Sequence, residues 1–422
     1  MPTRLLLASS LAMLLSIVAL MQAQIETQAP ERWWRGNLHT HTLWSDGDDF
    51  PEMVADWYRG HGYHFLALSD HNTLSAGDRW MPIAAINRRA GVDAFAKYQK
   101  RFGDSWVETR AADLREVRLK TFDEFRTRVE EPDRFLMIQA EELTGSSGDG
   151  HSLHFNVTNL AEQLTMRMGG TVSDTIVRNL QMVEESARRT GRLSIMHVNH
   201  PNYQWGVTAE DLAAAVNERF FEVWNGVDND NDNGDATRAS TDAIWDIANT
   251  LRIVRYNASP LYGLATDDTH DHHGNKSRAL PGRAWVMVRA RHLTPESMLR
   301  ALRTGNFYSS SGVVLESVAY EKSKLSIEIQ PSGSETFVTR FIGTRKGVKL
   351  NGRPRGDGDA ITTLDYGDAK IGEVLAEVRG LNPTYTMRGD ELYVRAIVTS
   401  SGAPEVPSEE FAYKRAWVQP VR

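Results

Sequence analysis

The chain contains no cysteine among its 422 residues. This absence excludes disulfide bonds, thiolate nucleophiles, cysteine-ligated zinc and iron–sulfur clusters. Any bound metal must therefore be held by histidine, aspartate or glutamate. An excess of positive charge is also lacking, because 48 lysines and arginines face 55 aspartates and glutamates and leave a net charge of −7. Without a basic block the chain has no footprint for non-specific binding to phosphate backbones, so nucleic acid is not an expected partner.

Long hydrophobic runs are equally scarce. The one membrane-like stretch of the sequence runs from Leu5 to Met21, follows Arg4 and ends just before the small residue Ala23. This pattern predicts a signal peptide over residues 1–23, with an uncleaved membrane anchor as the alternative. In either case we expect the folded part to be secreted or in a bacterial periplasm, where disulfides are permitted but not required.

Short apolar runs alternate with amphipathic segments from Gly36 to about Thr304. The strand candidates are Asn37–His41, His64–Ser69, Phe135–Ala140, Leu153–Val157, Leu193–Val198, Phe220–Val223, Tyr262–Ala265 and Ala284–Val288. The predicted helices between them are Pro51–Arg59, Val172–Arg189, Ala209–Asn217, Thr237–Asn249 and Pro295–Arg303. This alternation is typical of repeated β-α units and predicts an α/β barrel over residues 24–318.

Two further segments depart from the β-α pattern. Residues 75–132 carry two helical patterns, Pro82–Arg101 and Thr121–Val129, and few strand signals, so we expect an insertion over one end of the barrel. Residues 319–422 alternate in the β manner between turns that contain Gly and Pro, and predict an all-β, sandwich-like domain. Its strand candidates are Leu325–Ile329, Phe337–Ile342, Ile361–Leu364, Glu373–Val378 and Leu392–Val398.

Histidines and carboxylates gather where the predicted strands end. These groups are His39 and His41, Asp70-His71, Glu141-Glu142, His200, and Asp268 with His270. The carboxyl ends of the strands of a parallel barrel meet on one face, so residues scattered over more than 200 positions would converge on one cavity. Two imidazoles with a carboxylate form a site suited to zinc, manganese or iron(II), and the two oxygens of Glu142 could bridge two ions.

The motifs around these residues resemble those of the PHP (polymerase and histidinol phosphatase) metallohydrolases. The similar segments are Gly36-Asn-Leu-His-Thr-His-Thr-Leu-Trp-Ser-Asp-Gly47, Leu66-Ala-Leu-Ser-Asp-His-Asn72, His197-Val-Asn-His-Pro201 and Ala265-Thr-Asp-Asp-Thr-His270. Glu142-Leu-Thr with the later His154, Phe221-Glu-Val-Trp-Asn225 and Gly305-Asn-Phe-Tyr308 are similar to the secreted, carbaryl-hydrolase-like branch. The resemblance implies a distorted (β/α)7-type barrel, metal-dependent hydrolysis and a C-terminal β-sandwich.

The resemblance also implies three ion sites. One ion would be held by His39, His41, Glu142 and Asp268, a second by Glu142, His154 and His200, and a third by Asp46, His71 and His270. His151 competes with His154, and His197 competes with His200. We favour His154 because it lies within an apolar run, and His200 because its His-Pro dipeptide matches the family. Glu141 competes with Glu142, and strand alternation turns one of the two away from the cavity.

Some polar residues have a structural interpretation beside the functional one. The segment Asp228-Asn-Asp-Asn-Asp-Asn-Gly-Asp235 superficially resembles a calcium loop, but Ser240 stands at the twelfth position, where a bidentate glutamate is needed. We therefore expect an Asn/Asp-rich turn. Glu222 is expected to support the ligands rather than to bind an ion. His272 and His273 could line the cavity mouth or belong to a plain loop.

The sequence supports three hypotheses for function. Two or three divalent ions of zinc, manganese or iron could activate a bridging hydroxide, with no catalytic side chain beyond the metal ligands. The first hypothesis is a phosphoesterase acting on a small-molecule phosphate ester. The second keeps the same ions but attacks a carbonyl carbon, as a carbamate, ester or amide hydrolase. The third is a non-catalytic secreted binding protein in which metals stabilise the barrel.

Overall fold

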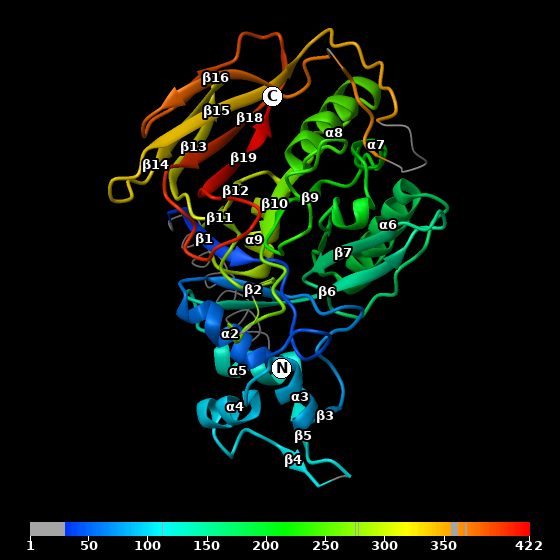
Figure 1. The fold of residues 1–422 in the computed structure, drawn as a ribbon, viewed down its shortest axis with the longest axis vertical. Coiled ribbons are helices and arrows are strands. Elements are labelled where there is room, and N and C mark those ends of the chain that lie inside the picture. The colour runs from blue at the N-terminus through cyan, green and yellow to red at the C-terminus, as the bar shows by residue number, and fades with distance from the viewer. Residues whose placement is uncertain (1–29, 112, 275, 277, 356–361, 368) are drawn as a thin grey trace, which may run out of the picture.

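The computed structural model describes residues 30–422 apart from 112, 275, 277, 356–361 and 368 (Figure 1). The predicted signal peptide, residues 1–23, lies outside the described residues. Among the helices that are described, none has the length and apolar character needed to cross a membrane.

Eight α-helices form in the described part of the chain, and several begin at a side-chain cap. Thr171, Ser240 and Thr294 each accept a hydrogen bond from an amide of the first turn that has no partner within the helix. Because Ser240 is the cap, the helix predicted over Thr237–Asn249 begins later, at Thr241. It also extends beyond the predicted end, to Arg255. The helices are α2 (Pro51–Gly60), α3 (Ile83–Ala90), α4 (Ala94–Phe102), α5 (Phe122–Val129), α6 (Val172–Thr190), α7 (Ala209–Ala214), α8 (Thr241–Arg255) and α9 (Pro295–Arg303).

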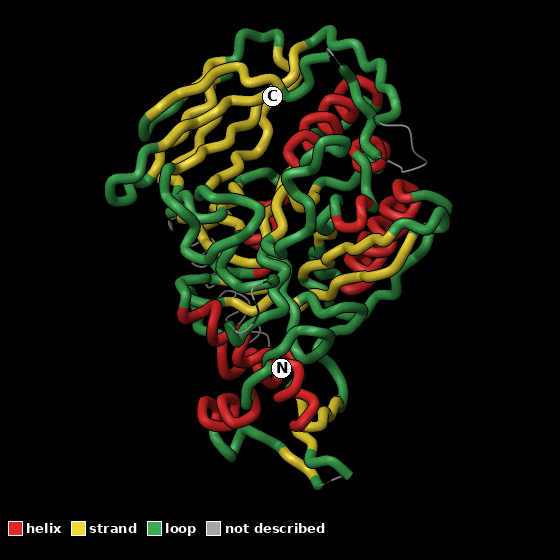
Figure 2. The backbone as a smooth tube through the Cα atoms, in the orientation of Figure 1, coloured by secondary structure: helices red, strands yellow, loops and turns green. Residues whose placement is uncertain are grey.

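One large sheet runs through the molecule, with helices packed against it (Figure 2). Its strands, in hydrogen-bonding order, are β10 (Tyr262–Thr266), β9 (Phe220–Asn225), β8 (Ile195–Val198), β7 (Ser152–Thr158), β6 (Leu136–Ser146), β2 (Phe65–Leu68), β1 (Arg32–Asn37), β11 (Trp285–Ala290), β12 (Phe307–Ser310), β19 (Arg415–Val421), β18 (Glu391–Ser400), β15 (Phe337–Arg345) and β16 (Glu373–Arg379). Two small sheets have the orders β13 (Leu315–Glu321), β14 (Lys324–Ile329), β17 (Thr384–Thr386) and β3 (Arg79–Pro82), β5 (Glu116–Leu119), β4 (Thr109–Arg110). The fold is therefore mixed α/β.

Strand β7 breaks the parallel arrangement that the sequence suggested. It runs antiparallel to both of its neighbours, β6 and β8. Residues 147–151 join β6 to β7, whereas a parallel crossover needs about a dozen residues or more. As a consequence, the start of β7 lies at the same edge of the sheet as the carboxyl ends of β6 and β8.

The predicted (β/α)7-type barrel is not confirmed, because the described strands form an open sheet. β11 pairs antiparallel with β1 and occupies the edge that a closed barrel would offer to β10. The segments that follow β1 and β10 do contact each other. The backbone amide of Asp268 donates to the carbonyl of His39, and the backbone amide of His41 donates to the carbonyl of Thr269, both at 3.0 Å. These bonds hold two ligand-bearing segments side by side.

The insertion lies at the end of the molecule opposite the C-terminal strands (Figure 1). The predicted Pro82–Arg101 helix is two helices, because Gly91 adopts a φ of 67° and ends α3. The antiparallel sheet β3-β5-β4 was not expected from the sequence. Phe50 stacks on Tyr98 with ring centroids 3.9 Å apart, so the insertion packs against the segment that follows the loop carrying Asp46.

The C-terminal strands continue the large sheet. β19 pairs with β12 on one side and with β18 on the other, and β13, β14 and β17 cover this part of the sheet across an apolar core that includes Leu325, Phe341 and Tyr385. The boundary predicted near Val318 falls inside β13. Of the predicted strand Ile361–Leu364, Ile361 lies outside the described residues and the rest forms no strand.

The C-terminal strands also pack against a strand and a helix of the first part of the chain, β9 and α8. The ring of Trp417 stacks on Trp224 at 5.9 Å, within a core shared by both halves of the molecule. On β18, Arg395 forms a buried ion pair of 2.6 Å with Asp246 of α8. The sandwich-like part is thus built onto the α/β part through apolar and charged contacts.

Candidate metal centre

All nine residues predicted as ligands come together at one edge of the large sheet. They are His39, His41, Asp46, His71, Glu142, His154, His200, Asp268 and His270. Most of them lie at or just past the carboxyl end of a strand, as the sequence argument required. His154 lies near the start of β7 instead, and reaches the same edge because β7 is antiparallel to β6.

Buried aspartates fix the loops that follow two of these strands. Asp70 accepts hydrogen bonds from the amide of Thr42 at 2.8 Å and from the hydroxyl of Ser45 at 2.6 Å. Asp267 accepts from the amides of Arg283 and Ala284 at 2.7 and 2.8 Å. The ligands that follow β1 and β10 are therefore presented by segments held in place by carboxylates that are not ligands themselves.

The deepest part of the centre is formed by His39, His41 and Asp268. Both imidazoles are fully buried, and the side chain of Asp268 is nearly so. Oδ1 of Asp268 lies 3.1 Å from Nε2 of His39 and 3.0 Å from Nε2 of His41. Two atoms bound to one ion at about 2.0–2.1 Å with tetrahedral angles stand roughly 3.4 Å apart. The spacing therefore suits ligands of a single ion.

These three ligand atoms make no hydrogen bond in the described part of the chain. Nε2 of His39, Nε2 of His41 and Oδ1 of Asp268 are all buried. Oε1 of Glu222 lies 2.7 Å from Nδ1 of His39, so in the neutral imidazole Nδ1 donates its proton there and Nε2 keeps a lone pair. A lone pair that faces a carboxylate oxygen is stabilised by a cation between the two atoms. The residues present thus fit a divalent ion.

The electrostatics of the centre indicate the same need for positive charge. Burial lowers the pKa of His39, but Asp268, Glu222 and Glu142 outweigh it and raise the pKa well above its ordinary value. Burial raises the pKa of Asp268, yet the imidazoles, with His39 foremost, hold it well below its ordinary value. For His41, burial and a neighbouring imidazole lower the pKa. Metal ions would take the place of the protons that otherwise compensate these carboxylates.

Glu142 directs its two oxygens towards different imidazoles. Oε1 faces His154 at 2.9 Å, His39 at 3.5 Å and His200 at 3.7 Å, whereas Oε2 faces His71 at 2.7 Å and His41 at 3.4 Å. The side-chain amide of Asn199 donates to Oε1 at 2.7 Å and fixes the carboxylate. Burial raises the pKa of Glu142, but His71 and His154 hold it well below its ordinary value. An ionised carboxylate with oxygens on two sides is the arrangement that a bridging ligand requires.

The second predicted set is brought together less tightly. Nε2 of His200 lies 4.0 Å from Oδ2 of Asp268, and the compact group around Glu142 consists of His71 and His154 rather than His154 and His200. The ring of Tyr203 lies against both His154 and His200, with centroids 5.6 and 5.1 Å away. His200 therefore faces the centre, but at a longer distance than the other imidazoles.

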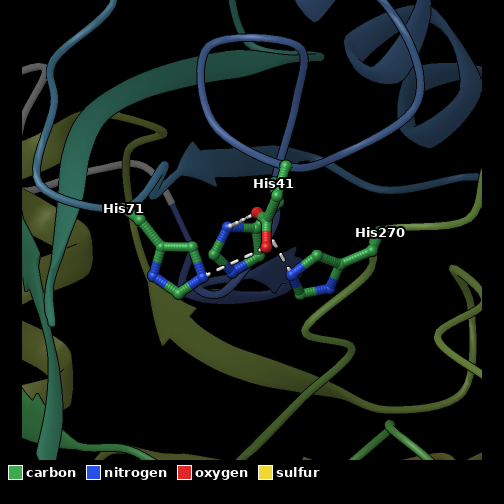
Figure 3. Close-up of side chains that lie close together, drawn as sticks. His41, His71 and His270 are labelled. Carbon is green, nitrogen blue, oxygen red and sulfur yellow. Dashed lines mark ion pairs between the residues drawn. The ribbon is translucent and has the colours of Figure 1, made fainter. Parts of the chain in front are cut away.

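The third set forms the open side of the centre. The rings of His41, His71 and His270 converge from three different segments (Figure 3), and oxygens of Asp46 lie 3.4–3.5 Å from a nitrogen of each ring. Burial lowers the pKa of His71, but Glu142 and Asp46 raise it to about 11. The side chain of Asp46 is 54% exposed and those of His71 and His270 are 25% exposed. The centre is thus exposed to solvent on this side.

The structure places the competing residues in different positions. His151 lies in the turn before β7, where its amide donates to the hydroxyl of Ser147. His197 lies behind His39, with Nε2 at 3.4 Å from Glu222, and it forms with His39 and Glu222 a further compact group that could hold an ion. Glu141 points away from the centre and accepts the amide of Leu164 at 2.6 Å, and burial raises its pKa to about 7.

Several supporting residues were missed or left open by the sequence argument. The side-chain amide of Asn225 donates to Glu222 at 2.9 Å and to Asp268 at 3.1 Å. The hydroxyl of Thr266 donates to Glu222 at 2.7 Å. Asn199 and Asn225 belong to segments quoted for the family resemblance, which was the available signal. Glu222, expected as a supporting residue, orients His39. His272, which was left open, packs behind His41, with Nε2 3.2 Å from its carbonyl.

The Asn/Asp-rich segment is a turn, as expected. Asp228 binds Arg283 at 2.9 Å, and Asp235 accepts the amides of Thr237 and Arg238. The compact groups of possible ligands among the described residues do not include this segment. Asp228 and Asp235 are thus engaged in contacts within the protein.

Comparisons with known proteins are sparse. No protein-family model matches the chain, and no curated protein sequence matches it. The solved structures similar to it include a two-domain protein from Bacteroides vulgatus containing a predicted PHP-like metal-dependent phosphoesterase, with 13% identity over 93% of this chain and 97% of that one and a TM-score of 0.38. PsfC from Pseudomonas syringae is 13% identical over 64% of this chain and 88% of its own, with a TM-score of 0.35. A protein from Bifidobacterium adolescentis, described as a candidate metal-dependent phosphoesterase, is 10% identical over 58% of this chain and 90% of its own, with a TM-score of 0.32. At these identities and TM-scores the likenesses carry no weight for activity, and none supports the carbaryl-hydrolase-like branch.

Proposed function

We propose that this protein is a metal-dependent hydrolase of phosphate esters. The observation that carries the proposal is the set of buried ligand atoms on His39, His41 and Asp268 that make no hydrogen bond, beside the two-sided carboxylate of Glu142. Nitrogen and oxygen donors of this kind suit zinc, manganese or iron(II). The nine converging residues provide ligands for two to three ions.

The chain's own residues hold this ligand set in place. When bound, clustered divalent ions lower the pKa of water towards neutrality and withdraw charge from substrate oxygens. Glu222 fixes the ring of His39, and Asn199 fixes the carboxylate of Glu142. Since these groups are buried and hydrogen-bonded, the ligands need little rearrangement when charge develops during the reaction.

The choice of a phosphate ester follows from the number of ligand groups. A phosphoryl transition state spreads charge over several oxygens, which clustered ions can bind together, whereas a carbonyl develops charge on one oxygen. The substrate would enter on the side of Asp46, His71 and His270, where the centre is exposed. A small phosphate monoester or diester is the substrate class that this arrangement favours.

A panel with one leaving group tests the proposal. The protein, reconstituted separately with zinc, manganese and iron(II), is assayed on 4-nitrophenyl phosphate, bis(4-nitrophenyl) phosphate, 4-nitrophenyl acetate and a 4-nitrophenyl carbamate. We expect much faster turnover of a phosphate, and none by a His39→Ala/His41→Ala variant purified in the same way. Turnover of the acetate or carbamate alone would indicate a carbonyl hydrolase. No turnover of any substrate by metal-loaded protein would indicate a binding protein.

A further inference from the structure

The turn that carries Asp46 folds back onto the backbone of His41. The backbone amide of Leu43 donates to the carbonyl of Asp49 at 2.9 Å and closes the turn. A Cβ atom at Gly47 would stand 2.6 Å from the carbonyl carbon of His41, so the two backbones approach more closely than a larger residue allows. As a result, the carboxylate of Asp46 comes within 3.4–3.5 Å of three imidazoles of the metal centre.

A side chain of the insertion contacts this turn on both sides of Asp46. Nη1 of Arg89, on α3, donates to the carbonyl of Ser45 at 2.9 Å and to the carbonyl of Gly47 at 3.1 Å. These two carbonyls belong to the residues immediately before and after Asp46. In the described part of the chain, Arg89 forms no ion pair with a carboxylate. Its charge therefore strengthens these two hydrogen bonds instead, because a charged donor binds a carbonyl more strongly than a neutral one.

Other contacts of the insertion fix one end of the same turn. The guanidinium of Arg79, on β3, donates to the carbonyl of Trp44. The indole of Trp44, which is 3% exposed, donates to the carbonyl of Lys120 at 3.0 Å. Trp44 precedes Asp46 by two residues, whereas the side chain of Asp46 itself is 54% exposed. The end of the turn is thus anchored in the insertion, and Arg89 extends this anchoring across the ligand position.

The order of this turn matters for metal binding because Asp46 is the most exposed of the carboxylate ligands. A turn that moved freely would lose conformational entropy each time its carboxylate bound an ion, and this cost would lower the affinity. Residues that hold metal ligands in place without binding the ion themselves typically account for about 10–100-fold in affinity.

We propose that Arg89 is a positioning residue for the ion of the third set, because it holds the backbone on both sides of Asp46 where that carboxylate faces His71 and His270. The inference rests on the proposed function, since it concerns an ion of the same centre. It also gives the insertion a role. Residues 75–132 contribute none of the nine ligands, yet they set the affinity for metal on the open side of the centre.

Titration with metal tests the inference without any substrate. Metal-free protein is titrated with zinc and, separately, with manganese in a calorimeter, and bound metal is counted by elemental analysis. We expect Arg89→Met to bind one ion about 10–100-fold more weakly than the wild type, and to keep its other ions and its circular dichroism spectrum. Arg89→Lys should regain part of the affinity, because an ammonium also offers N–H groups to two carbonyls. Arg88→Met, which changes an exposed neighbour on α3, is the control and should bind metal like the wild type.

A double-mutant cycle shows whether Arg89 acts through Asp46. Asp46→Asn removes the charged ligand and should weaken the same ion. If Arg89 acts by holding Asp46, adding Arg89→Met to Asp46→Asn should change metal affinity by less than about twofold, far below the sum of the two single effects. An arginine that only stabilises the fold would give additive effects.

Four results would overturn the inference. Arg89→Met could bind every ion like the wild type, or more tightly because a positive charge has been removed, and either result would show that Arg89 does not hold the ligand. Additive effects in the cycle, or an Asp46→Asn variant that binds metal like the wild type, would contradict it as well. Should Arg89→Met fail to fold, Arg89→Gln replaces it, and the same cycle decides.

The titration also separates the inference from the proposed function. A wild-type protein that binds no metal would end both. A protein that binds metal but hydrolyses no phosphate ester would end the proposed function alone, and the effect of Arg89→Met on metal affinity would still decide the inference.

Discussion

Two buried clusters of charge in this molecule obtain their positive charge in different ways. Between α8 and β18, both oxygens of Asp246 accept hydrogen bonds, from Arg395 at 2.8 and 2.6 Å and from the hydroxyl of Tyr393 at 2.7 Å. At the metal centre, ligand atoms of His39 and Asp268 face one another with no hydrogen bond between them. The first cluster contains a permanent cation, Arg395, which also forms an ion pair of 3.1 Å with Asp242. The second pairs its carboxylates with imidazoles, which can bind a metal ion in place of a proton, and this difference separates a structural ion pair from a candidate binding site.

Removal of the C-terminal part should have the largest effect, the loss of the folded structure, because both clusters belong to one interconnected structure. A chain ending at Val318 would cut β13 and remove β19, the neighbour of β12, and Trp417, which packs on Trp224. We expect it to be insoluble or unfolded, since a large apolar face would be exposed. Soluble yield and circular dichroism provide the measurement, with residues 24–422 expressed in parallel. A soluble, metal-binding fragment would show that the halves are independent modules.

Glu142→Gln should abolish most of the function of the centre while leaving the ion pair of α8 and β18 intact. A neutral amide cannot supply two charged oxygens to two ions, and a loss of several kcal/mol corresponds to roughly a thousandfold in activity. Metal content and kcat/KM are the measurements. Glu141→Gln is the matched control and should cost little, because the side chain of Glu141 points away and accepts the amide of Leu164. The opposite ranking of the two variants would contradict the assignment.

Arg395→Met should produce the reverse pattern. It leaves Asp246 buried without its cation, which costs about 3–5 kcal/mol of the free energy of unfolding. The folded fraction should keep its full metal content, because the centre contains neither residue. Denaturant unfolding with elemental analysis checks both expectations. Arg340→Met, which removes a cation from the exposed pair with Glu377, should change stability little. Loss of metal from folded Arg395→Met protein would show that the two clusters are coupled.

Glu222→Gln should have the smallest effect of the series. The amide can still contact His39 and Asn225, but it removes the charge that holds the His39 tautomer. Changes of this kind cost about 10–100-fold in metal affinity. Competition with a metal chelator measures the change. An unaltered affinity would mean that the position of His39 is set by the backbone alone.

Local signals in the sequence located most of the fold, whereas long-range pairing decided what was missed. Apolar runs marked most strands of the first part because those strands are buried, but the predicted strand Asn37–His41 is wrong, since β1 is Arg32–Asn37 and the ligand-bearing residues follow it. The reversed direction of β7 follows from the short connection at residues 147–151, which the predicted bounds hid because they ended the preceding strand at Ala140 and not at Ser146. The open sheet could not, because it depends on β11 pairing with β1 across about 250 residues of chain. Strand β19 was missed for a related reason, since Arg415–Val421 joins the large sheet only through distant partners.

The site was easier to predict than the sheet that carries it. Ligand-type residues at successive strand ends converge whether or not the barrel closes, so the structure brings His39 and His41 together with Asp268 as the spacing predicted. Alternation predicted that one of Glu141 and Glu142 faces away, and the family resemblance favoured Glu142 as the inward one. The longer distance of His200 depends on the course of the turn after β8, which no spacing encodes.

Elemental analysis of the natively purified protein tests the central claim most directly. The ligand atoms without hydrogen bonds that follow β1 and β10, together with Glu142 and its neighbouring imidazoles, predict two to three equivalents of zinc, manganese or iron per chain. His39→Ala/His41→Ala should lose at least one equivalent while keeping its circular dichroism spectrum. A wild-type protein that carries no transition metal, and whose hydrolytic activity is not stimulated by adding any, would contradict the account.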